Sequence, residues 1–135
     1  MKSVDEMIAE ARETITEYTP AEALRLQSES GAVIVDIRDV RELQREGVIP
    51  GAIHAPRGML EFWVDPQSPY HKPVFAEDRA FILNCASGWR SALSAKTLDD
   101  MGMANVSHIV GGFVAWRDDG LAVETHDEWK AAAGG

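Results

Sequence analysis

Apolar residues in the first part of the chain recur with the period of an α-helix. They stand three and four positions apart at Val4, Met7, Ile8, Ala11 and Ile15. This spacing places them on one helix face. Ser3 followed by Glu6 is the pattern of a capping box, which starts a helix by binding its free backbone N–H groups. We therefore predict an N-terminal amphipathic helix within residues 1–15. It packs on its own domain or binds a partner, and packing on its own domain is the simpler interpretation.

Three later segments are mostly apolar, and the first of them is rich in β-branched residues. They cover residues 32–37, 80–84 and 106–110. A strand with apolar residues on both faces is typical of a parallel sheet that is covered on both sides. We expect shorter strands near residues 16–19 and within residues 47–54.

Helix-start and helix-stop signals separate these strands. Capping patterns occur at Thr19-Pro20 and at Asp39, and Gly31 and Gly102 each follow a helical pattern. The expected helices cover residues 20–30, 40–46 and 91–101, with helical turns within 57–64 and around Trp116, and a frayed helix after Thr125 with a flexible end.

Strands alternate with helices along the chain, which predicts an α/β fold. We expect a central, mainly parallel β-sheet flanked by helices on both faces, with the extra N-terminal helix beside it. One domain would cover residues 16–125, between the helix of residues 1–15 and a C-terminal tail over residues 126–135.

The composition narrows the function classes. The chain has 135 residues, enough for one domain with a proper core. Its 13 Lys and Arg against 22 Asp and Glu give a formal net charge of −9. Nucleic-acid backbones require clustered positive charge, so we expect no nucleic-acid partner.

The sequence contains no apolar run of bilayer length and no signal-peptide pattern, which indicates a cytoplasmic protein without a membrane partner. The four histidines lack the spacing of metal ligands, and no glycine-rich nucleotide fingerprint occurs. We therefore expect no metal ion and no other cofactor.

The single cysteine, Cys85, excludes internal disulfides, a cysteine-rich zinc site and a CxxC redox pair. It is either an inert buried thiol or a reactive one. It directly follows a predicted buried strand, at the sheet edge where α/β folds bind ligands. The loop from Cys85 to Ser91 contains Gly88 and Arg90 and leads into a helix. Loop N–H groups, the helix N-terminus and the Arg90 charge all favour a thiolate over a thiol, so we expect a nucleophile on an exposed loop.

Four segments, in order, resemble motifs of the rhodanese-like domains. Val35-Asp36-Ile37-Arg38 resembles the family's Asp-Val-Arg segment, residues 47–53 its Gly-His-Ile-Pro-Gly-Ala segment, residues 85–91 its pattern Cys-x-x-Gly-x-Arg-Ser, and residues 111–116 its Gly-Gly-x-x-x-Trp motif. The resemblance extends from Thr16 to Val123. Val48 departs from the pattern, because the family often has His there. That position is structural in most members, so we do not take its loss as loss of activity.

The resemblance implies a sulfurtransferase. The Cys85 thiolate would attack the sulfane sulfur of thiosulfate or of a persulfide donor and carry it as a persulfide. An outside thiol, cyanide or an acceptor protein would then remove the sulfur. Arg90 would bind the anionic donor, and the loop amides with the Ser87 and Ser91 hydroxyls would stabilise the persulfide. No histidine base is expected, because a thiolate already carries the charge.

The candidate site residues follow from the loop and the resemblance together. They are the catalytic Cys85 and Arg90, the substrate-binding and persulfide-binding Ala86, Ser87, Gly88, Trp89, Ser91 and Arg57, and the supporting Asp36 and Arg38.

Three of these positions keep two interpretations. Arg57 is a second anion-binding residue or a surface arginine in an ion pair. Trp89 lines the mouth of the pocket or packs on residues 60–63. Asp36 orders the loop or contacts substrate. The segment of residues 58–78 is long for a plain connection and suits a lid or recognition surface.

Two other functions compete with sulfur transfer. A cysteine-dependent phosphatase or arsenate reductase is disfavoured, because cysteine phosphatases have five residues between Cys and Arg, whereas four separate Cys85 from Arg90. A non-enzymatic binding or regulatory module would use the helix of residues 1–15 or the segment of residues 58–78, but it would not need an intact cysteine loop.

Overall fold

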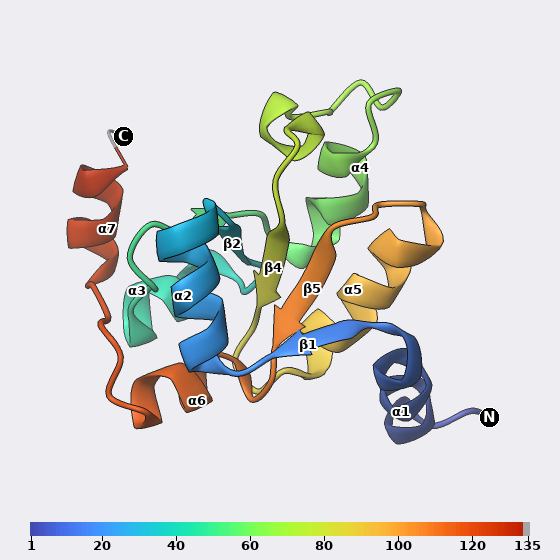
Figure 1. Ribbon diagram of the computed structural model, residues 1–135, viewed down its shortest axis with the longest axis horizontal. Coiled ribbons are helices and arrows are strands. Elements are labelled where there is room, and N and C mark those ends of the chain that lie inside the picture. Colours follow the sequence, from blue (N-terminus) through green and yellow to red (C-terminus); the bar gives the residue numbers. More distant parts are fainter. Residues whose placement is uncertain (134–135) are drawn as a thin grey trace.

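The computed structural model describes residues 1–133 and contains a five-stranded parallel sheet. The strands lie in the order β1-β5-β4-β2-β3 (Figure 1). Their bounds are β1 (Thr16–Tyr18), β2 (Val33–Asp36), β3 (Ile53–His54), β4 (Phe81–Asn84) and β5 (Val106–Ile109). The three long apolar runs form the three central strands, because a strand covered on both faces requires apolar residues at successive positions.

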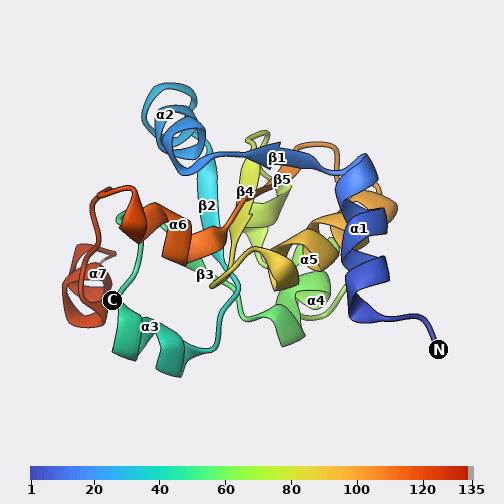
Figure 2. The same ribbon diagram turned by 90° about the horizontal axis from the view of Figure 1, so that it is seen from below.

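Helices lie on both faces of the sheet, which confirms the predicted α/β class. One side carries α1 (Val4–Thr14), α4 (Leu60–Val64) and α5 (Trp89–Asp100), and the other carries α2 (Pro20–Ser30), α3 (Val40–Glu46), α6 (Gly112–Asp118) and α7 (His126–Ala132) (Figure 2). Two short 3-10 turns, η1 (Arg57–Met59) and η2 (Pro73–Ala76), precede and follow α4. Within residues 1–133, no helix combines the length and the apolar character that crossing a bilayer requires.

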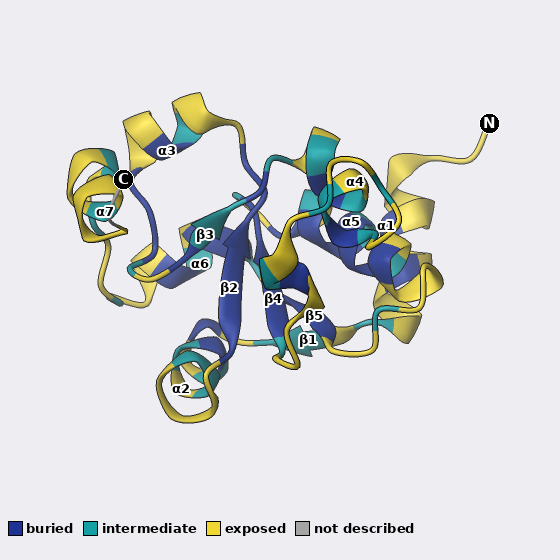
Figure 3. Ribbon diagram, turned by 90° about the horizontal axis from the view of Figure 1, so that it is seen from above, coloured by how far each residue is buried: buried dark blue, intermediate teal, exposed yellow. Residues whose placement is uncertain are grey.

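Successive residues of the central strands point to opposite faces of the sheet. Val35 and Leu83 pack into the core beneath α4 and α5. Ile34 and Ile82 pack into a second core beneath α2 and α6. Figure 3 shows the three central strands, β2, β4 and β5, as the buried centre of the molecule and the exposed residues on the outer surfaces of the helices. Burial on both faces holds the carboxyl end of β4 in place, and the cysteine loop begins there.

The N-terminal helix packs on its own domain, against α5, which confirms the simpler interpretation. Ile8 and Ala11 are buried, whereas Val4 and Met7 remain 51% and 43% exposed. The apolar face in contact is therefore narrower than the sequence pattern predicts.

Helix α5 begins at Trp89, two residues before the predicted start. Gly88 is its N-cap and has a φ of +91°, which glycine adopts without a Cβ clash. This residue turns the chain into the helix directly after the loop. Trp89 and Arg90 therefore belong to the first helical turn, whereas the sequence analysis placed them in the loop.

The C-terminal segment forms a helix, as predicted, and the helix is attached to the domain. Thr125 and Glu128 form a capping box at the start of α7. Trp129 packs against the core beneath α2 and α6, and its Nε1–H donates to the Ala52 carbonyl at 2.6 Å. The last two glycines of the predicted flexible end lie outside the described residues.

Helix α6 binds the backbone of the cysteine loop. The N–H groups of Phe113 and Val114 donate to the carbonyl oxygens of Cys85 and Ala86 at 2.8 and 3.0 Å. Gly112 makes this approach possible, because a Cβ atom there would lie 2.6 Å from the Cys85 oxygen. The Gly-Gly-x-x-x-Trp motif therefore supplies a close-packing contact between α6 and the loop.

We expect Gly112→Ala to destabilise the protein more than Gly120→Ala. Both glycines have a positive φ, +59° and +76°, but a Cβ atom at Gly120 meets nothing within 4 Å. Gly120→Ala should cost about 1–2 kcal/mol for the left-handed backbone alone. Gly112→Ala should cost about 1–3 kcal/mol more, because its Cβ overlaps backbone atoms that cannot rotate away. Urea unfolding measures both free energies, and equal losses would contradict a tight contact between α6 and the loop.

Candidate active site

Cys85 lies at the carboxyl edge of the sheet, between β4 and the start of α5. Its side chain is fully buried, so the prediction of a nucleophile on an exposed loop was wrong in that respect. The side chain stands two positions after Leu83 and therefore points to the same face, into the core beneath α4 and α5. The sulfur is shielded from water, so any charge that it carries depends on protein groups.

Two backbone amides donate hydrogen bonds to this sulfur. The N–H of Gly88 lies 3.1 Å from Cys85 Sγ, and the N–H of Ser91 lies 3.4 Å from it. Ser91 belongs to the first turn of α5, a helix of 12 residues whose N-terminus carries a partial positive charge. Both contacts stabilise a thiolate more than a thiol.

The other loop residues lie differently. Ser87 is exposed, and Trp89 is 58% exposed, so the interpretation that Trp89 packs into the core was wrong. Trp89 lines a pocket of about 240 Å³ beside the loop, together with Arg12, Glu17, Ser87, Gly88 and His108. Ala86 is half-buried and is bound through its carbonyl oxygen to α6.

Arg90, the predicted donor-binding residue, forms a bidentate ion pair with Glu42 of α3. Its Nη1 and Nη2 donate to Oε1 and Oε2 of Glu42 at 2.8 and 2.9 Å. The hydrogen bond with Glu42 raises the pKa of Arg90, and the same hydrogen bond holds the pKa of Glu42 below its ordinary value. Arg90 is therefore charged, but a carboxylate already occupies one edge of its guanidinium. Glu42 also forms the capping box with Asp39 at the start of α3.

The structure connects Cys85 with a histidine through one side chain, whereas the sequence analysis expected no histidine base. Ser91 Oγ lies 3.5 Å from Cys85 Sγ and 2.8 Å from Nδ1 of His108 in β5. On its other side, His108 Nε2 lies 2.8 Å from Glu17 of β1. A single hydroxyl therefore joins the cysteine and the histidine. The sequence did contain one indication of this contact. His108 lies within an apolar strand, and a buried polar ring requires hydrogen-bond partners.

Asp36 and Arg38 form a buried ion pair at the end of β2. Nη2 of Arg38 donates to Oδ2 of Asp36 at 2.7 Å, and both side chains are almost fully buried. Arg38 also donates to the Gly47 carbonyl at 2.8 Å and lies 4.3 Å from the centre of the Phe113 ring. These contacts join β2 to the end of α3 and to α6, and they favour the supporting role over contact with substrate.

Arg57 is exposed and lines a different pocket, of about 320 Å³, between α1 and α5. That pocket contains Lys2, Glu10 and Lys96, and none of residues 86–91 lines it. A second anion-binding role for Arg57 stays a prediction.

Comparisons with known proteins extend these observations. Residues 19–119 match the rhodanese-like domain. The chain is 32% identical over 113 residues to the thiosulfate sulfurtransferase GlpE of Actinobacillus pleuropneumoniae, which covers 84% of this chain and 96% of the relative.

Two solved structures are similar across most of the chain. A Rhodopseudomonas palustris protein of unknown function, described as a possible tyrosine phosphatase, is 52% identical with a TM-score of 0.88, and the match covers 92% of this chain and 96% of that chain. A thiosulfate sulfurtransferase from Pseudomonas aeruginosa is 26% identical with a TM-score of 0.73, and the match covers 97% of this chain and 26% of that chain.

The parallel sheet, the cysteine loop before α5 and the family match over residues 19–119 agree with one another. The chain belongs to the family of rhodanese-like domains.

Proposed function

We propose that this protein is a sulfurtransferase that carries a sulfane sulfur on Cys85 from a small donor to an outside acceptor. One observation carries the proposal: the buried Cys85 sulfur accepts hydrogen bonds from the N–H groups of Gly88 and Ser91, where the short cysteine loop meets the first turn of α5. Such a loop can hold a single negatively charged sulfur. The sulfurtransferase relatives support the same class of reaction.

The proposed reaction has two displacements. First, the Cys85 thiolate attacks the outer sulfur of thiosulfate, the S–S bond of the donor breaks, and sulfite leaves with the electron pair. Cys85 then carries a persulfide. Next, cyanide or an acceptor thiolate attacks the outer sulfur, and the Cys85 thiolate leaves. A persulfide donor reacts in the same way, with a thiolate as its leaving group.

The acceptor comes from outside the chain, because Cys85 is the only cysteine. The persulfide has no second thiol within the molecule to resolve it. A small thiol or a protein thiol must therefore reach the outer sulfur directly.

Arg90 and Glu42 control the binding of an anionic donor in this proposal. The chain has a net charge of −9, so the overall field disfavours an anion and the local charge of Arg90 matters more. A donor oxyanion competes with the Glu42 carboxylate for the guanidinium. The ion pair with Glu42 therefore weakens the binding of a donor at Arg90.

A cysteine-dependent phosphatase is the second candidate, because the Rhodopseudomonas palustris protein described as a possible tyrosine phosphatase is 52% identical to this chain. Both reactions use a thiolate in an amide-lined loop. The four residues between Cys85 and Arg90 favour sulfur transfer, since a phosphatase loop is one residue longer.

A non-enzymatic role in which the N-terminal helix docks a partner is less well supported. Ile8 and Ala11, on the apolar face of that helix, are already buried against the domain.

We expect Cys85→Ser to abolish sulfur transfer while the protein stays folded. The wild-type protein should convert thiosulfate and cyanide to thiocyanate, and after treatment with donor its mass should rise by one sulfur atom. The serine variant should show neither change, because an alcohol is not ionised at neutral pH. If neither thiosulfate nor a persulfide donor modifies Cys85, the proposal fails. Hydrolysis of an aryl phosphate that depends on Cys85 would instead favour the phosphatase.

We expect substitutions of Arg90 and Glu42 to change the KM for thiosulfate in opposite directions. Arg90→Gln should raise KM about ten- to a hundredfold, because the variant loses a hydrogen bond between the charged guanidinium and the donor. Glu42→Gln should lower KM about two- to fivefold, because it keeps the side-chain oxygen that caps α3 but releases the Arg90 charge.

Glu46→Gln is the matched control, because it removes one negative charge from the same helix without a contact to Arg90. Its KM should stay close to that of the wild type. If KM falls as much in Glu46→Gln as in Glu42→Gln, the effect comes from the net charge and not from the ion pair between Arg90 and Glu42.

A further inference from the structure

A chain of hydrogen bonds leads from the sulfur toward the surface, and the displacement steps above do not use it. Cys85 Sγ lies 3.5 Å from Ser91 Oγ, which lies 2.8 Å from His108 Nδ1. His108 Nε2 lies 2.8 Å from Oε2 of Glu17, and Nε of Arg12 donates to the same oxygen at 3.0 Å. The chain thus connects the cysteine loop with β5, β1 and α1.

The Glu17 carboxylate determines the direction of each hydrogen bond. An ionised carboxylate only accepts, so Nε2 of His108 carries the proton and donates it. In a neutral ring, Nδ1 then accepts from the Ser91 hydroxyl. The Ser91 oxygen in turn accepts the thiol proton of Cys85. Every donor in this order faces an acceptor.

The protonation states required by this order agree with the surroundings of the two titratable groups. Burial lowers the pKa of His108 below its ordinary value, although the hydrogen bond with Glu17 opposes this, so the ring is neutral at pH 7. Burial disfavours the ionised form of Glu17, but hydrogen bonds from His108 and Arg12 outweigh it and lower the pKa of Glu17.

We propose that Ser91 and His108 form a proton relay that takes the proton from the Cys85 thiol and leaves a thiolate ready to attack the donor. The S–H bond of Cys85 breaks as Ser91 takes that proton, and the original Ser91 proton forms an N–H bond at Nδ1 of His108. The number of protons is unchanged and no group is oxidised or reduced. Ser91 touches the reacting sulfur, whereas His108 and Glu17 act through it as positioning residues. This inference rests on the proposed sulfur transfer.

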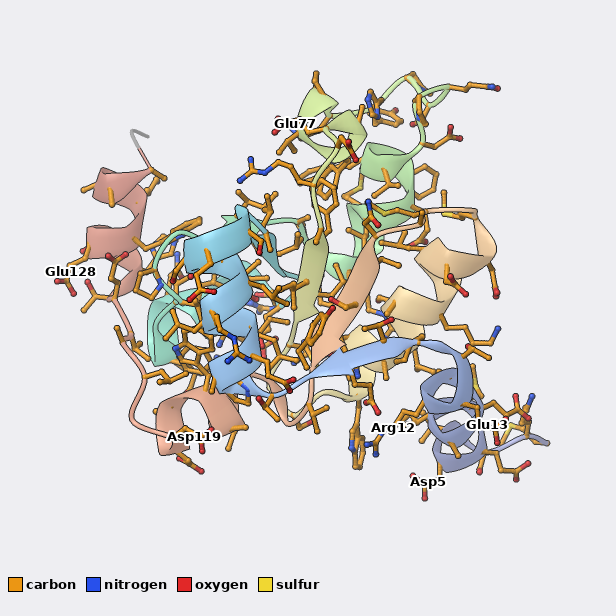
Figure 4. All side chains as sticks on the ribbon, in the orientation of Figure 1. Asp5, Arg12, Glu13, Glu77, Asp119 and Glu128 are labelled. Atoms are coloured by element: carbon orange, nitrogen blue, oxygen red, sulfur yellow. The ribbon has the colours of Figure 1, made fainter. Side chains whose placement is uncertain are left out.

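The charged groups that face His108 come from three other elements. Glu17 on β1 compensates the imidazolium, Arg12 on α1 fixes Glu17, and Cys85 follows β4. Arg12 extends from α1 toward the sheet, whereas Glu13 lies on the opposite side of the helix (Figure 4). The relay therefore gives the N-terminal helix a role in the site, since α1 positions Arg12.

The pocket of about 240 Å³ gives the relay an outlet to water. Arg12, Glu17, Trp89 and His108 all line it. The His108 side chain is only 2% exposed, whereas that of Glu17 is 23% exposed. A proton on the buried ring can therefore exchange with solvent on the Glu17 side, away from the sulfur.

The rate at which iodoacetamide alkylates Cys85 tests the relay without any sulfur transfer. Cys85 is the only cysteine, so mass spectrometry of the whole protein reports on it alone. In the wild type, the alkylation rate should change little with pH around neutrality, because the relay already holds the thiol proton. In His108→Asn, the rate should fall roughly tenfold for each pH unit below about 8 and approach that of the wild type at higher pH, where hydroxide removes the proton directly.

Further variants separate the relay from a structural effect. Ser91→Ala should give the same pH profile as His108→Asn, and combining them should add little, because both interrupt one path. Glu17→Gln keeps the size of the side chain and removes the charge that compensates the imidazolium, so its profile should shift in the same direction but less. Glu17→Gln also tests the relay if His108→Asn does not fold. His71→Asn is the matched control, because His71 hydrogen-bonds the Trp63 carbonyl outside the relay.

The outcomes distinguish the two proposals. If the wild type gains sulfur from thiosulfate but His108→Asn and Glu17→Gln keep the wild-type alkylation profile, the relay is overturned and sulfur transfer stands. A loss by the same factor at every pH would also overturn the relay, because it would indicate a structural role. If the variants lose the plateau near neutral pH but no donor modifies the wild type, the relay stands and the proposed function fails.

Discussion

The site depends on the way that α6 holds the peptide groups at Cys85 and Ala86. Their carbonyl oxygens accept hydrogen bonds from the first N–H groups of α6, at 2.8 and 3.0 Å. In a planar trans peptide the N–H points opposite to the C=O, so binding these carbonyls turns the N–H groups of the same peptide units away from α6. The contact forms only because Gly112 lacks a Cβ atom. A glycine 27 positions beyond the cysteine (112 − 85) thus shapes the loop around the sulfur.

Burial makes the sulfur depend on its protein neighbours. A thiolate without contact to water requires compensation, and the fold supplies it as two amide donors and the N-terminus of α5. The full charge of Arg90 is directed instead to Glu42 on α3. The site can thus stabilise a negative sulfur, while the guanidinium of Arg90 is paired with a carboxylate.

The two sides of the sheet contribute different groups to the site. On the side of α3 and α6, the buried pair of Asp36 and Arg38 joins β2 to its surroundings and holds the loop region together. On the side of α1 and α5, the path through Ser91 and His108 leads from the sulfur to Glu17. The sulfur lies between a rigid support and a polar path to water. The same parallel sheet brings both to its carboxyl edge.

Much of this architecture is predictable from local signals. The three apolar runs, the capping patterns at Thr19 and Asp39 and the loop that begins at Cys85 each act over a few residues, and the structure contains each of them. The start of α5 was predicted two residues late, because a glycine in a loop does not by itself indicate that the next residue begins a helix, whereas in the structure Gly88 is the N-cap with a positive φ. The burial of Cys85 was missed because a position after a strand does not specify what packs above it.

By itself, the sequence determined the α/β class, the order of strands and helices, and the position of one cysteine at the end of a central strand. Only the tertiary structure decided which partners the site residues have. Glu42 and Arg90 are 48 positions apart, Ser91 and His108 are 17 apart, and Glu17 and His108 are 91 apart. Such pairs leave no periodic or capping signal in the chain. They meet because β1 joins the sheet beside β5, and because α3 and α5 both begin at its carboxyl edge.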